Sequence, residues 1–269
     1  MSQAKAKSDL PVRAAAGVIL IAVALGAIYF GGMPFRLLVG VAAALMFVEW
    51  CNMHRIKKIW PLVGVVLLTL LLWVVPIFLF PSAQFENIAA AEVWYGMALA
   101  AIFALGVGVA RRSLTLGWGF LYIALPSYAL LVLNWLSWEA VLWAMVVTWS
   151  TDIFAYFAGR SIGGPKLAPR VSPNKTWAGL IGGMVGAGLL GAVTVILLDL
   201  DPMLGFLGAP MAFLAQMGDL YESWVKRRAG VKDSGNILPG HGGLLDRLDG
   251  LMPVIIATLV VVATRTWAA

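Results

Sequence analysis

Long apolar runs separated by short polar loops dominate the hydrophobic pattern of the chain. A helix that spans a membrane needs about 20 mostly apolar residues, and the pattern predicts nine such helices. The chain is therefore predicted to be all-α, a polytopic integral membrane protein. The nine segments are Val12–Phe30, Phe35–Glu49, Trp60–Phe80, Trp94–Ala110, Leu116–Leu133, Ala140–Phe157, Gly179–Leu198, Leu204–Leu220 and Leu251–Ala263.

The composition supports a membrane environment. Hydrophobic residues make up 61% of the chain and charged residues 12%, whereas an average soluble domain is about half apolar and about a quarter charged. The single cysteine, Cys51, excludes an internal disulfide. The net charge of +6 is typical of basic residues retained on the cytoplasmic face, so nucleic acid is not expected as a partner. The run Val12–Phe30 is too long for the core of a signal peptide and is interpreted as a retained helix.

The distribution of charge between the loops predicts the orientation. With a cytoplasmic N-terminus, every Lys and Arg except Arg36 and Arg265 falls in the N-terminal tail or in a loop on the same side. The opposite loops carry acidic residues such as Glu86 and Asp199. The positive-inside rule therefore predicts nine spans, with the N-terminus cytoplasmic and the C-terminus outside. Few polar groups occur at membrane depth before residue 140, so residues 1–140 are expected to form a scaffold with possible dimer contacts, and residues 141–269 to carry the site.

A first segment with candidate functional residues runs from Thr151 to Thr176. Asp152 lies in an apolar stretch, where an ionisable group is costly and usually faces a bundle interior or a water-filled cavity. Glycines and prolines exclude a continuous helix farther on. Ser172, Lys175 and Thr176 precede a helix and suit an anionic phosphate. An ordinary basic loop that only satisfies topology explains this segment equally well.

A second segment runs from Gln216 to Gly250. Asp219, Glu222, Ser223 and Lys226 recur with helical spacing and so share one face. That face holds carboxylates, a hydroxyl and an ammonium group where lipid-facing residues would be expected. A solvated loop with incidental ion pairs is the alternative, but topology alone poorly explains such clustering.

The end of this segment suits a metal ion and phosphates. Asp246 and Asp249 are three residues apart and point the same way if the chain is helical from Leu244. Mg²⁺ binds through one or two carboxylates together with substrate phosphates and waters. The turn from Pro239 to Gly243 can bring backbone amides close to a ligand. Cations that bind phosphates and aspartates that bind a metal ion are typical of phosphoryl or nucleotidyl transfer. One substrate is expected to be a membrane lipid.

The residues of both segments resemble a known family. The stretch from Ser223 to Asp249 closely resembles the signature of the phosphatidate cytidylyltransferases, also called CDP-diacylglycerol synthases. The stretches Gly218–Leu220 and Ser172–Thr176 are similar to this family too, although Asn174 stands where the family usually has a second basic residue. The motif resemblance covers roughly residues 150–269, and the N-terminal half matches only as a set of apolar spans.

The resemblance implies that CTP and phosphatidate react to give CDP-diacylglycerol and pyrophosphate with Mg²⁺, in an all-helical homodimer. The location would be the inner, or cytoplasmic, membrane, with the site facing the cytoplasm. A phosphate oxygen of phosphatidate would attack the α-phosphorus of CTP. Asp219, Asp246 and Asp249 would hold Mg²⁺, with a second cation possible. The candidate catalytic residues are Lys226, Asp219, Asp246 and Asp249, and the candidate substrate-binding residues are Ser172, Lys175, Thr176, Ser223, Arg227, Lys232, His241, Gly242, Gly243 and Arg247.

Two alternatives stay open. Intramembrane carboxylates also mark transporters of anionic substrates, although the internal repeats typical of transporters are not visible in this chain. A cytidylyltransferase that acts on a different lipid phosphate is the other alternative. His241 is expected to contact phosphate or stabilise its turn rather than act as a base or metal ligand. Glu49 is interpreted as a simple interfacial residue.

Overall fold

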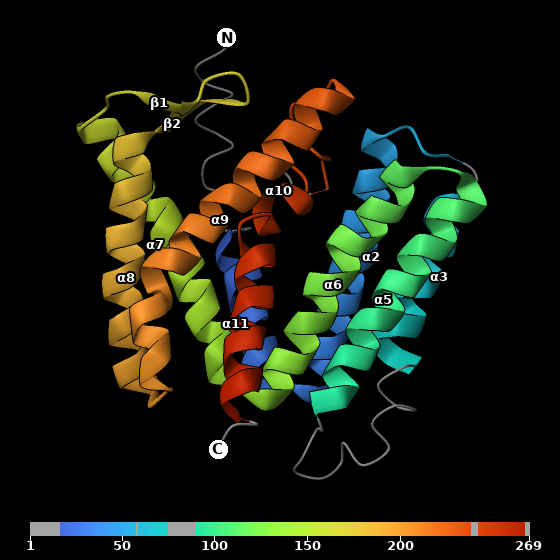
Figure 1. Cartoon of the computed structure of the whole chain (residues 1–269), viewed down its shortest axis with the longest axis horizontal. Coiled ribbons are helices and arrows are strands. Elements are labelled where there is room, and N and C mark those ends of the chain that lie inside the picture. Colours follow the sequence, from blue (N-terminus) through green and yellow to red (C-terminus); the bar gives the residue numbers. More distant parts are fainter. Residues whose placement is uncertain (1–16, 58, 75–89, 238–241, 267–269) are drawn as a thin grey trace.

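A computed structural model describes residues 17–57, 59–74, 90–237 and 242–266 of the chain, and most of them are helical (Figure 1). A helix from Gly17 to Phe30 comes first. The elements that follow are α2 (Gly32–Met53), α3 (Trp60–Thr69) continued by the π-helical turn η1 (Leu70–Val74), α5 (Ala90–Arg111), α6 (Leu114–Leu136), α7 (Trp138–Ser161), β1 (Lys166–Ala168), β2 (Ser172–Thr176), α8 (Trp177–Leu198), α9 (Pro202–Ala229), α10 (Leu245–Leu248) and α11 (Leu251–Thr266).

Each of the nine apolar segments is helical over its described part. Within the described residues, six helices are long and apolar enough to cross a membrane, and they correspond to α2, α5, α6, α7, α8 and α9. The other three apolar helices, Gly17–Phe30, Trp60–Val74 and Leu251–Thr266, are shorter. The protein is therefore a multi-pass membrane protein, while nine crossings and the orientation of the termini stay predictions. The basic tail before Gly17 and the loop with Glu86 lie outside the described residues.

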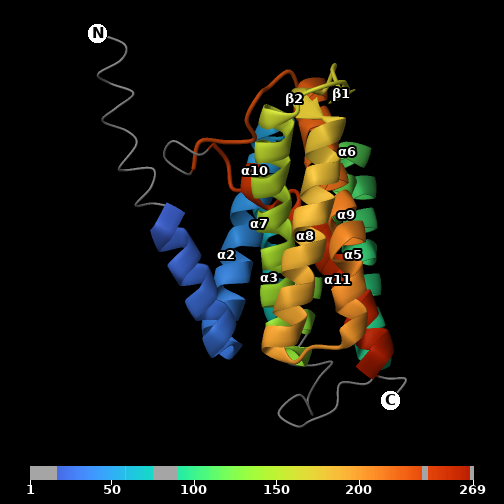
Figure 2. The ribbon, with the colours of Figure 1, turned by 90° about the vertical axis from the view of Figure 1, so that its left-hand side faces the viewer.

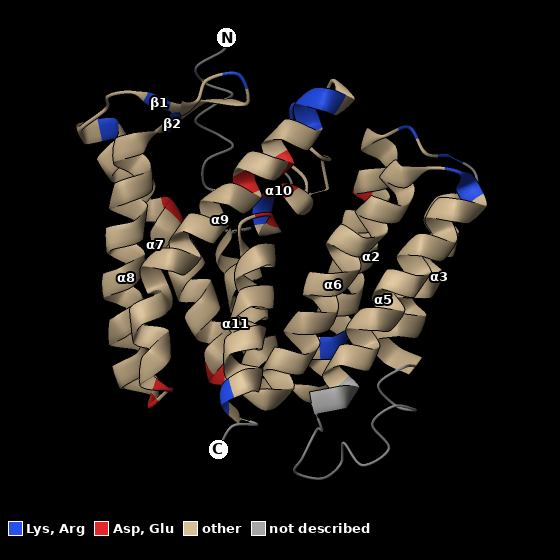
Figure 3. Cartoon of the chain, viewed as in Figure 1, with Lys and Arg blue, Asp and Glu red and all other residues tan. Residues whose placement is uncertain are grey.

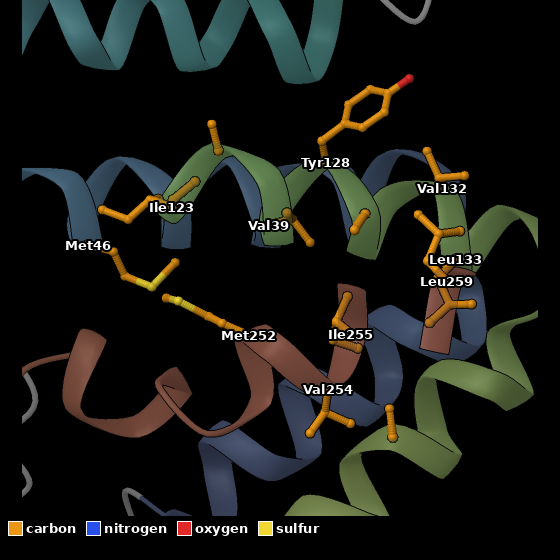
Figure 4. Close-up of a cluster of buried hydrophobic side chains, with 14 of the residues drawn as sticks. Val39, Met46, Ile123, Tyr128, Val132, Leu133, Met252, Val254, Ile255 and Leu259 are labelled. Atoms are coloured by element: carbon orange, nitrogen blue, oxygen red, sulfur yellow. The ribbon is translucent and has the colours of Figure 1, made fainter. Parts of the chain in front are cut away.

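The helices form two groups with α11 between them (Figure 1). Helices α7, α8 and α9 contact one another in one group, and α2, α3, α5 and α6 form the other. Helix α11 contacts α6 as well as α7 and α9. Buried side chains of α2, α6 and α11 meet in one cluster, where Met46 lies beside Met252 (Figure 4). The core is therefore continuous across the boundary expected near residue 140, and that division into two parts stays a prediction.

Small residues allow α7, α8 and α9 to approach closely. A Cβ atom on Gly183 of α8 would lie 3.0 Å from the carbonyl oxygen of Thr151, and one on Gly208 of α9 would lie 2.5 Å from that of Ala187. In membranes, where apolar surface alone does not drive helices together, such close contact is a main source of association. This packing fixes α9, which carries four of the predicted site residues: Asp219, Ser223, Lys226 and Arg227.

A two-stranded antiparallel hairpin departs from the all-α prediction. Strands β1 and β2 connect α7 to α8, with Lys166 opposite Thr176 and Ala168 opposite Ser172. The sequence excluded a continuous helix here but did not predict strands. The hairpin ends where the Thr176 hydroxyl accepts a 3.0 Å hydrogen bond from the Gly179 N–H and caps α8. The hairpin lies at the same end of the bundle as α10 (Figure 2).

Candidate active site

One face of α9 carries the polar residues that the helical spacing predicted. The Ser223 hydroxyl donates a 3.3 Å hydrogen bond to Asp219, one turn away. Lys226 forms an ion pair with Glu222, which is only 1% exposed. The basic last turn of α9 ends at Gly230, whose φ of 75° is the left-handed geometry that glycine adopts readily. The shared face is therefore confirmed.

The hairpin brings Lys175 against this face. Its ammonium nitrogen lies 2.6 Å from Asp219 and 2.9 Å from the side-chain oxygen of Gln216. Lys175 comes from the first predicted segment and Asp219 from the second, so the structure brings the two segments together. Both side chains are partly exposed, and a ligand entering from the end of the bundle can reach them.

Asp246 is held between α9 and the loop that follows it. One carboxylate oxygen lies 2.5 Å from the Lys226 nitrogen. The backbone N–H groups of Ser234 and Gly243 donate to the same carboxylate at 3.0 and 2.8 Å. Burial alone would raise the pKa of Asp246, but the hydrogen bonds from Lys226, Gly243 and Ser234 outweigh it and lower that pKa. Asp246 is thus an ionised carboxylate that orients Lys226.

Asp249 lies at the end of α10, directly before α11, and is 9% exposed. One of its oxygens accepts a 2.7 Å hydrogen bond from the N–H of Gly250. Burial, followed by repulsion from Asp219, raises the pKa of Asp249. The charges of Asp219 and Asp249 therefore disfavour one another, and a divalent cation beside them would offset that repulsion.

The three predicted metal ligands have different environments. Asp246 is neutralised by Lys226, whereas Asp219 and Asp249 repel each other. Over the ranges that the structure describes, no group of three His, Cys, Asp or Glu side chains is spaced to hold a metal ion. The oxygen donors of Asp219 and Asp249 suit Mg²⁺, and a site shared by all three aspartates stays a prediction.

The remaining candidate residues lie around this centre. Ser172 begins β2, and the buried Thr176 uses its hydroxyl to cap α8. Gly242 has a φ of 82° and lies beside Asp246. Arg227, Lys232 and Arg247 are exposed; Arg227 donates a 3.3 Å hydrogen bond to the Val231 carbonyl. His241 lies outside the described residues, so its contact with phosphate stays a prediction.

The sequence left two acidic residues without a role in the site. Asp152 of α7 is near enough to this cluster to be repelled by the charge of Asp219 and attracted by those of Lys175 and Arg247. The sequence suggested that Glu49 of α2 is a simple interfacial residue. The structure shows it buried instead, with only 2% of it exposed. Its signal was a carboxylate within an apolar segment, the same signal that drew attention to Asp152.

A cavity of about 540 Å³ lies on the opposite face of α9, bounded also by residues of α2 and α6. Trp118, Tyr221, Trp224 and Arg228 are part of its lining. The Arg228 guanidinium lies 4.9 Å from the centre of the Trp224 ring. Helical spacing puts Tyr221, Trp224 and Arg228 away from Asp219 and Lys226, so this cavity is separate from the carboxylate cluster.

Comparison with known proteins covers nearly the whole chain. The model of the cytidylyltransferase family matches residues 11–265. A phosphatidate cytidylyltransferase of Brucella abortus is 35% identical over 265 residues, which cover 91% of this chain and 90% of the relative. That of Pseudomonas aeruginosa is 34% identical over 97% of this chain and 98% of the relative, and that of Bacillus subtilis is 34% identical over 92% and 95%.

These matches extend the resemblance beyond the part that the motifs indicated. The similarity includes the N-terminal helices, so the expectation that this half matches only as a set of apolar spans was wrong. The motifs of the hairpin, α9 and α10 provided the first indication, and the matches over both halves agree with it. The chain belongs to the cytidylyltransferase family.

Proposed function

We propose that this protein transfers the cytidylyl group of CTP to phosphatidate, which gives CDP-diacylglycerol and pyrophosphate. The main observation is that Lys175 and Lys226, from different parts of the chain, each contact an aspartate of one cluster at an end of a membrane helix bundle. Cations held beside ionised carboxylates suit phosphate groups and a metal ion. The names of the bacterial relatives support the same reaction.

The reaction needs no strong general base. The second pKa of a phosphomonoester is about 6, so the phosphate of phosphatidate is largely dianionic near neutral pH. One of its oxygens forms a bond to the α-phosphorus of CTP while the bond to the β-phosphate oxygen breaks. Pyrophosphate leaves with that bridging oxygen and its electron pair. The new phosphoanhydride links the lipid phosphate to the cytidylyl group.

The main barrier is the mutual repulsion of two polyanions, and fixed cations reduce it. Lys226 is fixed by Glu222 on its own helix and by Asp246 on α10. Lys175 is fixed by Asp219 and Gln216. Both ammonium groups are therefore oriented before substrates arrive, and each would exchange part of its contact with an aspartate for contact with phosphate. Ser223, in contact with Asp219, offers a hydroxyl to the same substrates.

Asp219 and Asp249, with Asp246 beside them, would hold Mg²⁺, and a second cation is possible. The chemistry that Mg²⁺ would supply at these residues is neutralisation of phosphate charge and polarisation of the phosphoryl group. The support from the chain itself is the repulsion between Asp219 and Asp249, which a cation would relieve. These carboxylates would hold the cation, and Lys175 and Lys226 would contact the phosphates directly.

We also propose that the site faces the cytoplasm. Lys and Arg gather mainly at the end of the bundle that carries the hairpin and α10, and few lie at the opposite end (Figure 3). The positive-inside rule favours the cytoplasm for such an end. CTP would then enter from the cytoplasm, and phosphatidate would enter from the adjacent leaflet. A homodimer in the inner membrane completes the proposal.

The test is incubation of the purified protein in detergent with radiolabelled CTP, phosphatidate and Mg²⁺. We expect lipid-extractable cytidine and an equal amount of pyrophosphate. An isoprenoid phosphate in place of phosphatidate tests the other lipid substrate class. If product formed only with the isoprenoid phosphate, that lipid class and not phosphatidate would be the substrate. Uptake of an anion into proteoliposomes without any lipid-linked cytidine would favour a transporter.

A further inference from the structure

Helix α2 contributes a buried carboxylate, Glu49, to the catalytic end of the molecule. Only 2% of the residue is exposed, and its helix otherwise presents mostly apolar side chains to the core. An ionisable group in such a helix is costly unless partners compensate for its desolvation. Glu49 is far in sequence from every predicted site residue, and the proposed reaction gives it no direct part.

Among the residues that the structure describes, the hydrogen-bond partners of Glu49 belong to the segment between α9 and α11. The backbone N–H groups of Leu244 and Leu245 donate to its two carboxylate oxygens, each at 2.9 Å. The Ser234 hydroxyl lies 3.4 Å from one of these oxygens. Consistent with these bonds, α10 contacts α2. Glu49 therefore binds both ends of the loop from Ser234 to Leu245 at once.

Two glycines leave the space that this carboxylate occupies. A Cβ atom on Gly235 would lie 2.5 Å from a Glu49 oxygen, and one on Gly243 would lie 2.8 Å from the same oxygen. Any other residue at either position would displace the carboxylate or the loop. Sequence and geometry thus agree on a close fit between Glu49 and this backbone.

The loop that Glu49 binds is the one that holds Asp246. Ser234 and Gly243 donate their backbone N–H groups to Asp246, while Ser234 through its hydroxyl and the residue after Gly243 contact Glu49. The two carboxylates therefore hold the same two stretches of backbone. Asp246 in turn contacts Lys226 at 2.5 Å. A shift of the loop would move Asp246 and leave Lys226 held by Glu222 alone.

We propose that Glu49 is a positioning residue: through the backbone of Ser234, Leu244 and Leu245 it fixes Asp246, and through Asp246 it orients Lys226. The inference rests on the proposed function for its link to turnover. Glu49 itself does not touch substrate. It ties the N-terminal helix group to the catalytic loop, so that both halves of the chain are required for chemistry.

The test compares Glu49→Gln with a matched control in the same helix, Met46→Ala. Gln keeps the size of Glu but places an NH₂ group where one of the loop N–H donors needs an acceptor. We expect Glu49→Gln to lower kcat at least about tenfold with little change in the KM for CTP. Met46 is equally buried and one turn away, and it lies against Met252 rather than the loop (Figure 4). Met46→Ala should lower the melting temperature and leave kcat within about twofold of the wild type.

Hydrogen exchange of the backbone amides supplies a readout that does not depend on the reaction. Exchange at Ser234, Leu244 and Leu245, whose N–H groups are hydrogen-bonded in the wild type, should accelerate in Glu49→Gln and remain as in the wild type in Met46→Ala. Ser234→Ala removes a single contact with Glu49 and serves as a second variant if Glu49→Gln does not fold. It should show a smaller change in exchange of the same kind. Wild-type kcat in a folded Glu49→Gln variant, or an equal loss of kcat in Met46→Ala, would overturn the proposal. If the wild type made no lipid-linked cytidine, the proposed function would fail, and unchanged exchange in Glu49→Gln would separately refute the positioning role.

Discussion

At the scale of single residues, the site is organised by which aspartate has a cation beside it. Asp246 has Lys226, and Asp219 has Lys175, whereas Asp249 is buried and faces repulsion from Asp219. A carboxylate without a compensating partner is costly in a buried setting. Negative charge close to Asp249 is therefore less well compensated than at the other two aspartates, and a divalent cation would compensate it.

The aspartates can be tested by changing each of Asp219, Asp246 and Asp249 to Asn, which removes the charge and nearly preserves the shape. Each change should depress activity severely, because it removes either a metal ligand or the partner that orients Lys226. Where activity survives, the Mg²⁺ concentration for half-maximal rate should rise. Asp233→Asn, at an exposed loop position, is the control and should be tolerated. The measurement is the initial rate over a Mg²⁺ titration. Near wild-type rates of both Asp219→Asn and Asp246→Asn at low Mg²⁺ would show that the aspartates do not share a metal site.

Lys175 provides a second test at this scale. Its ammonium group lies 2.6 Å from Asp219, and in the proposed reaction it also binds phosphate. Lys175→Ala should reduce kcat/KM at least about tenfold, or about 1.4 kcal/mol of transition-state stabilisation. Lys166→Ala, on the other strand of the hairpin and exposed, removes the same charge from the same loop and should have little effect. Equal kinetics of the two variants would mean that Lys175 contributes only to topology.

At the scale of elements, helix periodicity gave the most detailed prediction of the candidate site. The spacing of Asp219, Ser223 and Lys226 was enough to predict that they share one face of α9, because the period of a helix is fixed. The hairpin was not predicted, since its strands are short and contain proline and lysine rather than typical strand residues. Glu49 could not be assigned either, because its partners are at Ser234, Leu244 and Leu245, and only the tertiary fold brings them close.

The contact between α9 and the junction of α10 with α11 makes a prediction about Gly218. A Cβ atom there would lie 2.4 Å from the backbone oxygen of Asp249 and 2.9 Å from Pro253. Gly218→Ala should therefore move Asp249 away from Asp219, with a large loss of activity and about 1–3 kcal/mol of destabilisation. Gly205→Ala in the same helix meets its nearest atom at 4.0 Å. It should keep full activity and gain slightly in stability, since alanine is the better helix former.

Activity assays and thermal unfolding in detergent distinguish these two variants of α9. Alanine favours helix at both positions, so a lower melting temperature of Gly218→Ala alone would have to come from the crowding at Asp249. A Gly218→Ala protein with wild-type activity and melting temperature would show that α9 and α11 can separate without cost.

At the scale of the whole molecule, α11 joins the two helix groups and Glu49 joins α2 to the catalytic loop. The sequence predicted where the apolar helices lie, because hydrophobicity is a local property. It could not predict how the N-terminal helices support the site, because that depends on contacts between distant segments. Through Glu49 the N-terminal half contacts the loop that holds Asp246, and the family match likewise includes this half, since it begins at residue 11.

The orientation of the molecule in the membrane gives the last prediction. The chain has one cysteine, Cys51, and it is buried, so Cys51→Ser provides a background for single cysteine labelling. Cysteines at Lys57 and Lys232, both exposed, should resist a membrane-impermeant thiol reagent in intact cells, because the positive-inside rule puts these loops in the cytoplasm. A cysteine at Leu200, in the turn between α8 and α9 beside Asp199, should react in the same cells. All three should react once the cells are permeabilised, which shows that each thiol is accessible. The reverse pattern in intact cells would put the catalytic end outside, where CTP is not available, and would rule out the reaction as proposed.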